Sequence, residues 1–243
     1  MVKKTRVLKE QYKFFYYYRG VEMMKIEKCL IPLGMIGVIF YFIHTILGNI
    51  LWADYNPITM DISSLTADGA PNAQLLRILS LIYSICMILM VLALVIKAFN
   101  KYHNLLKTGY LILLIMQLSS AFGYSLFPLT GDKTVMNFQN MMHIIVTVVV
   151  VFTTIASSFL ISLGYLKQEN MKRLGKISLF FAILITLFGM FNPISMAMQL
   201  NVLGLSERLV IYTIQVFMFI LSYYYTFLEK SSYVKNDKGY LTE

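Results

Sequence analysis

Two long apolar runs of this chain are joined by the stretch FPLTGDKTVMNFQNMMH, residues 127–143. The stretch begins with Pro128 and Gly131, which are typical turn residues, and ends in polar side chains that open the next apolar run. An apolar run of roughly 20 residues crosses a bilayer as a helix. The stretch therefore predicts a short loop between two membrane helices, and we expect the site chemistry to converge on this loop and on the helix entrance after it.

Outward from this loop, apolar runs of spanning length recur along the whole chain of 243 residues. Hydrophobic side chains make up 58% of the sequence, which is more than an ordinary soluble domain contains. The fold class predicted is therefore all-α: a polytopic membrane protein built as a six-transmembrane-helix bundle. The expected spans are residues 30–51, 75–96, 108–127, 139–164, 177–194 and 208–228.

The basic residues predict the orientation. Of the 21 Lys and Arg residues, all but Arg77, Lys133 and Arg208 lie on one side of the predicted bundle. Because positive residues remain cytoplasmic, we expect a multi-pass protein of the cell membrane with both termini inside. The net charge of +9 then faces anionic lipid headgroups at the inner surface and does not indicate nucleic-acid binding.

The predicted organisation has three parts. Residues 1–29 form a basic, aromatic cytoplasmic segment, residues 30–228 the transmembrane domain, and residues 229–243 a short cytoplasmic tail. Met23 and Met24 stand just before the first span, so a translation start at either is an alternative to Met1.

The first outer loop is rich in polar and turn-forming residues. Asp61 is expected to cap a short helical turn that includes Ser64. Ile62 and Leu65 lie in the same turn and need an apolar surface to pack against. We therefore expect residues 57–71 to fold back as a lid over the outer mouth of the bundle.

Three spans carry further expectations. The second holds few polar residues and is predicted to be scaffold. The fifth is expected to end at Asn192-Pro193, where proline removes a backbone donor. The sixth opens with Gly-Leu-Ser-Glu-Arg-Leu, in which Ser206 is expected to cap the helix and Arg208 to lie at the outer membrane edge.

The fourth span begins with a polar face. Asn140 and His143 are three residues apart and so lie on one side of a helix. Polar side chains in a span are costly unless they face protein or water. Both residues are therefore candidates for a site at the outer surface.

Three groups of residues, in this order, resemble a known family: Asp61-Ile-Ser-Ser-Leu65 with Asp68-Gly-Ala-Pro71, then Leu126-Phe-Pro128 with Asp132 and His143, then Gly204-Leu-Ser-Glu-Arg-Leu209. The chain resembles, over about residues 30–230, the prokaryotic membrane family called domain of unknown function 998. It is more distantly similar to eukaryotic six-span proteins of GPI-anchor lipid remodelling and autophagy modulation.

The resemblance implies a six-helix bundle and lipid handling. The family positions that it carries over are Asp61, Asp132, His143 and Arg208. The sequence departs from the pattern at residues 72–74, Asn-Ala-Gln, where no second acidic residue follows the proline.

We therefore expect a polar site at the outer face that binds a lipid or another amphipathic ligand, with membrane lipids as partners. In this reading Arg208 binds a phosphate, and His143 or Asp61 binds a hydroxyl. The candidate ligand-binding residues are Asp61, Ser64, Asp132, Asn140, His143 and Arg208.

Two other classes of function remain open at this point. In the first, an intramembrane hydrolase holds Zn²⁺ through His44, His143 and Asp61, with water in the open position. In the second, the chain is a structural or accessory subunit of a partner membrane protein. The first would make the protein an enzyme and the second would not.

Overall fold

The computed structural model describes residues 26–130 and 137–229, and Asp132 lies outside these ranges. Six helices in the described ranges are long and apolar enough to cross a membrane, and these ranges contain no β-strand. The predicted all-α membrane fold is thereby confirmed. The long helices are α2 (Leu33–Leu51), α3 (Ala73–Lys101), α4 (Asn104–Leu126), α5 (Phe138–Leu166), α6 (Lys172–Ala197) and α7 (Leu203–Tyr223), with short turns η1 (Ser63–Thr66), η2 (Glu169–Met171) and η3 (Tyr224–Leu228).

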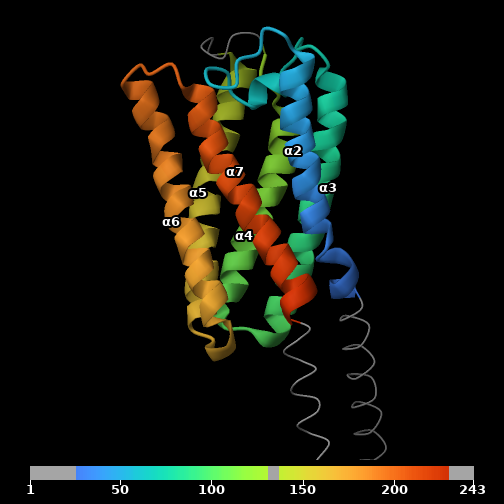
Figure 1. Ribbon diagram of the computed structural model, residues 1–243, viewed down its shortest axis with the longest axis vertical. Helices are drawn as coiled ribbons and strands as arrows, with labels where there is room; N and C mark the ends of the chain where they lie inside the picture. Colours follow the sequence, from blue (N-terminus) through green and yellow to red (C-terminus); the bar gives the residue numbers. More distant parts are fainter. Residues whose placement is uncertain (1–25, 131–136, 230–243) are drawn as a thin grey trace, which may run out of the picture.

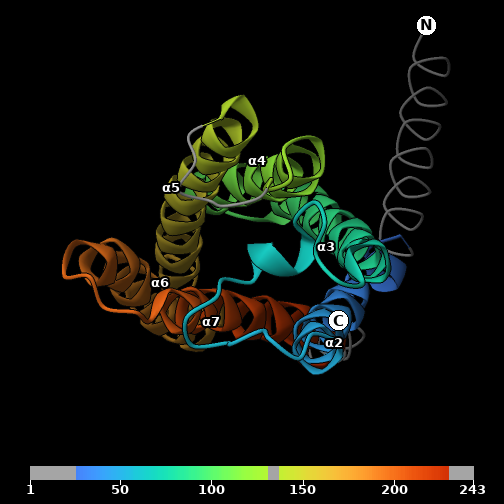
Figure 2. The same ribbon diagram turned by 90° about the horizontal axis from the view of Figure 1, so that it is seen from above.

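The helices form a ring in chain order (Figure 2). Each helix packs against the next one, and α7 returns to pack against α2. Short connections make consecutive helices antiparallel, so the bundle has two distinct ends (Figure 1). We call the end that carries residues 52–72 the loop end, and the end where residues 26 and 229 lie the terminal end.

Among the described residues, the larger of two hydrophobic core clusters lies toward the terminal end of the ring, and a smaller one, which includes Leu65 and Leu76, lies at the loop end. The larger cluster contains the fully buried side chains of Met90 and Leu94 of α3, Tyr110 of α4, Tyr165 of α5 and Leu221 of α7. Large apolar side chains also cover the outside of the bundle, as expected for helices that face lipid tails.

An ionic cluster closes the terminal end. The Lys97 ammonium lies 3.2 Å from the Glu27 carboxylate and 2.8 Å from that of Glu229, and Lys97 is only 5% exposed. The Tyr102 hydroxyl donates to Glu229 at 2.8 Å. The predicted second span, residues 75–96, ends too early, because α3 continues to Lys101 and buries Lys97.

Two predicted helix ends are also wrong. Helix α6 does not stop at Pro193 but continues to Ala197, with the Ser195 hydroxyl donating to the carbonyl of Asn192 at 2.8 Å. Helix α7 begins at Leu203, and Ser206 lies inside its first turn. The Ser206 hydroxyl donates to the Leu203 carbonyl at 2.9 Å, so it does not cap the helix.

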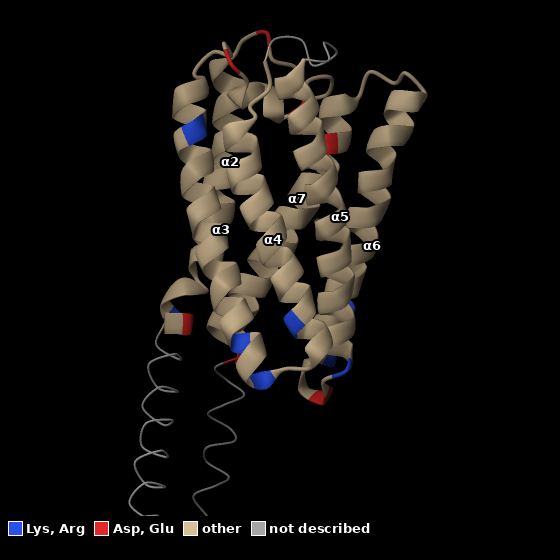
Figure 3. Cartoon of the chain, turned by 180° about the vertical axis from the view of Figure 1, so that it is seen from behind, with Lys and Arg blue, Asp and Glu red and all other residues tan. Residues whose placement is uncertain are grey.

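Basic side chains gather at the terminal end (Figure 3). At the loop end the described basic residues are Arg77 and Arg208. This asymmetry is the one on which the predicted orientation rests, with the terminal end in the cytoplasm. The orientation itself stays a prediction.

Candidate functional site

The segment 57–71, which we call the lid, lies over the loop end of the ring, with its η1 turn in the centre (Figure 2). Ile62 and Leu65 are 5% and 0% exposed, so the predicted docking of this segment is confirmed. The Asp61 carboxylate accepts hydrogen bonds from the Ser64 hydroxyl and, at 3.1 Å, from the Ser64 backbone N–H. Asp61 thus caps η1 as expected.

Helix α7 holds the lid through two adjacent residues. Arg208 donates from Nη1 to the carbonyls of Pro57 at 2.8 Å and Met60 at 3.0 Å. Its Nη2 donates to the Tyr55 hydroxyl at 2.5 Å. The Glu207 carboxylate accepts the backbone N–H of Ile62 at 2.5 Å. Arg208 therefore satisfies backbone carbonyls of the lid and is not one of the side chains that line the cavity below it.

The lid approaches α7 closely because residue 204 is glycine. A Cβ at Gly204 would lie 2.1 Å from the Met60 carbonyl oxygen and 2.6 Å from that of Pro57. Any larger side chain would displace the backbone carbonyls that Arg208 binds. In the sequence motif Gly-Leu-Ser-Glu-Arg, Gly204 thus leaves room for the lid backbone, and Glu207 and Arg208 bind it.

Helix α3 holds the other end of the lid. Arg77 donates from Nε and Nη2 to the Thr66 carbonyl at 3.0 and 2.8 Å, and its Nη2 lies 2.6 Å from the Asp68 carboxylate. The backbone N–H of Asp68 donates to the Leu129 carbonyl at 2.9 Å. The lid is thereby joined to the connection between α4 and α5.

Asn140 and His143 lie on one face of α5, as expected, and hold the chain segment before the helix. The Asn140 amide contacts the backbone of Thr130, accepting at 3.0 Å and donating at 3.1 Å. The His143 Nδ1 donates to the Phe127 carbonyl at 2.8 Å, and its ring packs on Tyr124 at 4.8 Å between centroids. Because a carbonyl only accepts, Nδ1 carries the proton.

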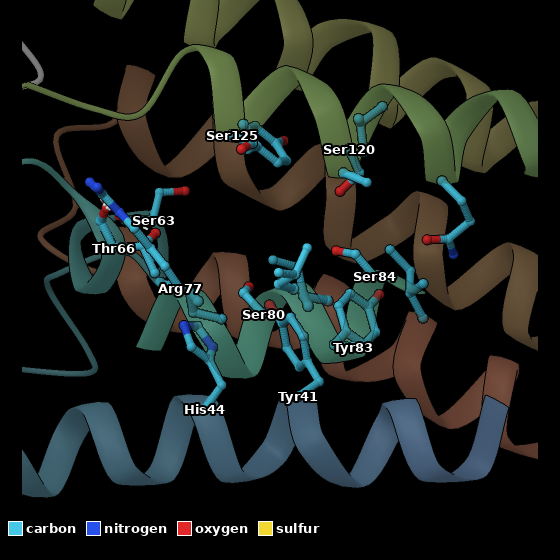
Figure 4. Close-up of a pocket in the computed structure, with 18 of the residues that line it drawn as sticks. Tyr41, His44, Ser63, Thr66, Arg77, Ser80, Tyr83, Ser84, Ser120 and Ser125 are labelled. Carbon is cyan, nitrogen blue, oxygen red and sulfur yellow. Dashed lines mark hydrogen bonds between the residues drawn. The ribbon is translucent and has the colours of Figure 1, made fainter. Parts of the chain in front are cut away.

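A cavity of about 360 Å³ lies beneath the lid, and its lining includes Ile62 of the smaller core cluster and Met116 of the larger one. Side chains from α2, α3, α4 and the lid point into this shared space (Figure 4). Many of them carry hydroxyls, including Ser63 and Thr66 of the lid, Ser80 and Ser84 of α3, and Ser120 and Ser125 of α4. The prediction that the second span is only scaffold is therefore wrong, because α3 supplies one wall of the cavity.

Three buried polar side chains that line this cavity carry atoms without a hydrogen-bond partner in the described part of the chain. Neither ring nitrogen of His44 has one, nor does Nε2 of Gln117 or Oε1 of Gln215, within the part of the chain that the structure describes. The three residues are 3%, 3% and 2% exposed. Leaving such a group unsatisfied costs about 1–3 kcal/mol, so buried polar atoms normally find a partner. A ligand in the cavity could supply the missing hydrogen-bond partners of these groups.

The exposed part of the cavity lining belongs to α3 and α4, from which we infer a mouth between these two helices. The exposed lining residues are Arg77 and Leu81 on α3 and Ser125 on α4, and Leu81 is 59% exposed. These two helices are joined at the terminal end, by a connection at residues 102–103. Because both are spanning helices, this mouth opens sideways, toward the bilayer.

Of the predicted site residues, His143 lines the cavity. Asp61, Ser64, Asn140 and Arg208 lie around it and hold the lid and the segment before α5. Their joint action on a ligand stays a prediction, and Asp132 lies outside the described residues. The expected site omits Gln117 and Gln215, although an amide inside a span is itself a signal of a buried polar environment.

The residues of the zinc alternative do not come together as a metal site. Within residues 26–130 and 137–229, no three His, Cys, Asp or Glu side chains gather closely enough to hold a metal ion. His44, His143 and Asp61 therefore do not form a three-ligand cluster in the described structure.

The protein family described as Protein of unknown function (DUF998) matches residues 35–224. The chain belongs to the DUF998 family. The match covers the lid, helices α3 to α7 and all but the first two residues of α2, so the resemblance expected from the sequence is confirmed at the level of the family. No curated protein and no solved structure matches the chain. The more distant eukaryotic similarity stays a prediction.

Proposed function

We propose that this DUF998 protein binds a lipid or a lipid-like amphipathic ligand, with the polar head in the cavity and the apolar part leaving between α3 and α4. The observation that carries the proposal is the convergence of His44, Gln117 and Gln215 on one cavity with unpartnered polar atoms. Buried groups of this kind favour a polar ligand, because an apolar one would leave them unsatisfied.

The position of the mouth favours a ligand that arrives through the bilayer. The lid covers the loop end and is held on both sides, by Arg208 of α7 and by Arg77 of α3. The cavity instead reaches the surface beside Leu81 and Ser125, within two spanning helices. A lateral opening with the apolar Leu81 on one edge and the hydroxyl of Ser125 on the other suits a molecule that has both apolar and polar surfaces.

The volume of about 360 Å³ lies within the range of roughly 300–1,000 Å³ that small-molecule pockets occupy. It accommodates a head group but not a whole lipid with its acyl chains. The acyl chains of a bound lipid would therefore remain in the surrounding bilayer, which the lateral mouth permits.

The proposal is tested by filling the cavity. Ala121 lines the cavity on α4, whereas Ile115 on the same helix is 53% exposed and does not line it. Native mass spectrometry of protein extracted in mild detergent should detect a bound lipid in the wild type and in Ile115→Phe, and little of it in Ala121→Phe. Melting curves confirm that both variants are folded.

The same measurement separates the other classes of function. Equal lipid binding by Ala121→Phe and the wild type would overturn the proposal. A second membrane protein that co-purifies in fixed ratio, with no bound lipid, would favour the accessory subunit. Stoichiometric zinc by elemental analysis would favour the hydrolase.

A further inference from the structure

We infer that the head group bound in this cavity is neutral and rich in hydroxyls, as in a sugar-bearing or glycerol-bearing lipid, and is not a phosphate. The inference rests on the proposed function and names the chemistry of its ligand. It follows from the donors and acceptors that face the cavity and from the charges around it.

His44 requires a ligand that both donates and accepts hydrogen bonds. Its ring is 3% exposed, and neither nitrogen has a partner in the described structure. A buried imidazole without an ion-pair partner is neutral, because burying an isolated charge is costly. A neutral imidazole presents one N–H donor and one acceptor nitrogen. A hydroxyl can satisfy either of them, whereas a fully ionised phosphate can only accept.

The two glutamines repeat this requirement from other walls of the cavity. Gln215 of α7 donates from Nε2 to the Tyr83 hydroxyl at 2.9 Å, and its Oε1 is left as an acceptor. Gln117 of α4 leaves its Nε2 as a donor. If the oxygen and nitrogen of a glutamine amide are exchanged, the side chain still presents either a donor or an acceptor to the cavity. Together with His44, the amides offer both kinds of partner from three helices, as a polyhydroxyl head group needs.

The charges around the cavity do not favour an anion. Among the described lining residues, one carries a positive charge, Arg77, and one a carboxylate, Glu207. Arg77 already binds the Thr66 carbonyl and the Asp68 carboxylate, so its charge is largely compensated. Arg208, the expected phosphate ligand, binds backbone carbonyls of the lid and does not line the cavity. A phosphate would therefore meet an opposing carboxylate and no uncompensated cation among these residues.

The test compares lipids that differ only in their heads. The purified protein in detergent is titrated with a monoglucosyl diacylglycerol, with phosphatidic acid of the same acyl chains, and with free glucose. We expect the glucosyl lipid to bind at least about tenfold more tightly than phosphatidic acid, because a site built for hydrogen-bonding hydroxyls discriminates against ligands that lack them. Free glucose should bind much more weakly, since it lacks the acyl chains that the lateral mouth accommodates.

Variants connect this preference to the cavity. Gln117→Leu and Gln215→Leu should each weaken binding of the glucosyl lipid by about fivefold, the effect of losing one ordinary hydrogen bond. The matched control is Gln74→Leu, which removes an exposed amide from the start of α3 and should leave binding unchanged. Ala121→Phe should abolish binding. Melting curves of all variants show whether they are folded.

The outcomes separate the two proposals. If phosphatidic acid binds as tightly as the glucosyl lipid and Ala121→Phe abolishes its binding, the inference about the head group is wrong while the proposed function stands. If no lipid responds to Ala121→Phe, the proposed function is wrong, and the inference with it. If free glucose binds as tightly as the glucosyl lipid, the cavity prefers hydroxyl-rich ligands as inferred, but the proposal that the ligand is a lipid is wrong.

Discussion

The carboxylate of Glu207 lies 2.5 Å from the backbone nitrogen of Ile62, although the two residues are 145 positions apart in the chain. Its neighbour Arg208 bonds the carbonyls of Pro57 and Met60 in the same segment. An acidic and a basic side chain thus satisfy a donor and two acceptors of the lid backbone from adjacent positions of one helix. These two side chains fix the position of the lid because they satisfy both N–H and carbonyl groups of its backbone.

Replacing Arg208 with Gln should loosen the lid. The change removes charged hydrogen bonds to two lid carbonyls and to the Tyr55 hydroxyl, and we expect a loss of about 2–4 kcal/mol in the stability of the loop end. The single tryptophan of the chain, Trp52, packs on the Tyr55 ring at 5.5 Å between centroids. Its fluorescence emission should therefore shift to longer wavelength as water enters.

The matched control is Arg173→Gln, which changes an exposed arginine at the terminal end. It should leave both the emission of Trp52 and the melting temperature close to those of the wild type. Unchanged emission in Arg208→Gln as well would show that the guanidinium does not hold the lid.

Gly204→Ala tests the close approach of the lid to α7. An added Cβ would overlap the Met60 carbonyl oxygen at 2.1 Å, so the lid has to move and the melting temperature should fall by several degrees. Gly189→Ala is the control, since the nearest atom to its added Cβ lies at 3.9 Å. Because alanine favours a helix over glycine, this control should be neutral or stabilising. Equal effects of the two changes would contradict the proposed packing.

The pH dependence of lid stability should depend on Tyr55. Burial raises the pKa of the Tyr55 hydroxyl to about 12, above the unperturbed value of about 10. A raised pKa in the folded state stabilises it fully below about pH 10, and this contribution is lost as the pH rises toward 12. The melting temperature of the wild type should therefore fall more steeply between about pH 10 and 12 than that of Tyr55→Phe. Parallel curves would show that Tyr55 does not ionise differently on unfolding.

Hydropathy alone predicts the six spans, because each helix must present an apolar surface to lipid whatever its partners are. The docking of Ile62 and Leu65 is also predictable, since two apolar side chains in a polar loop require a surface. The capping of η1 by Asp61 follows from local chemistry, with both partners within three residues.

The roles of Arg208 and Lys97 could not be predicted in this way. Arg208 was expected to bind a ligand, yet its partners are carbonyls about 150 positions earlier, which no local pattern indicates. Lys97 lies just beyond the predicted second span, and its two carboxylate partners come from the far ends of the described chain. The expected polar site at the loop end included His143 of the cavity lining but not Gln117 or Gln215, for the same reason. The unpartnered groups of the cavity come from three helices, and only the ring brings them to one space.

Lys97→Met should destabilise the terminal end. The change leaves the Glu27 and Glu229 carboxylates without their shared cation, and breaking a buried pair in this way costs about 3–5 kcal/mol. Lys176→Met, at an exposed lysine of α6, is the control and should change the melting temperature little. Adding Glu27→Gln to Lys97→Met should restore part of the loss, and a further loss in the double variant would contradict the role of the pair.

Cysteine labelling tests the orientation. In a background without Cys29 and Cys86, a cysteine at the exposed position Asp54 should react with an impermeant maleimide added to intact cells. A cysteine at the exposed position Lys172 should react only after the membrane is permeabilised. Labelling of position 172 in intact cells would reverse the predicted topology.

The closure of the ring by α7 has a consequence for how the protein is made. The lid lies between the first two spans and is synthesised well before Gly204, Glu207 and Arg208 of the last span, which hold it in place. Until the last helix is in place, Ile62 and Leu65 have only the part of their packing surface that α2 and α3 supply, without Ile211 and Tyr212 of α7. Packing of the last helix therefore completes the ring and holds the lid in the same step, so a chain interrupted before that helix should leave the backbone groups of the lid without these partners.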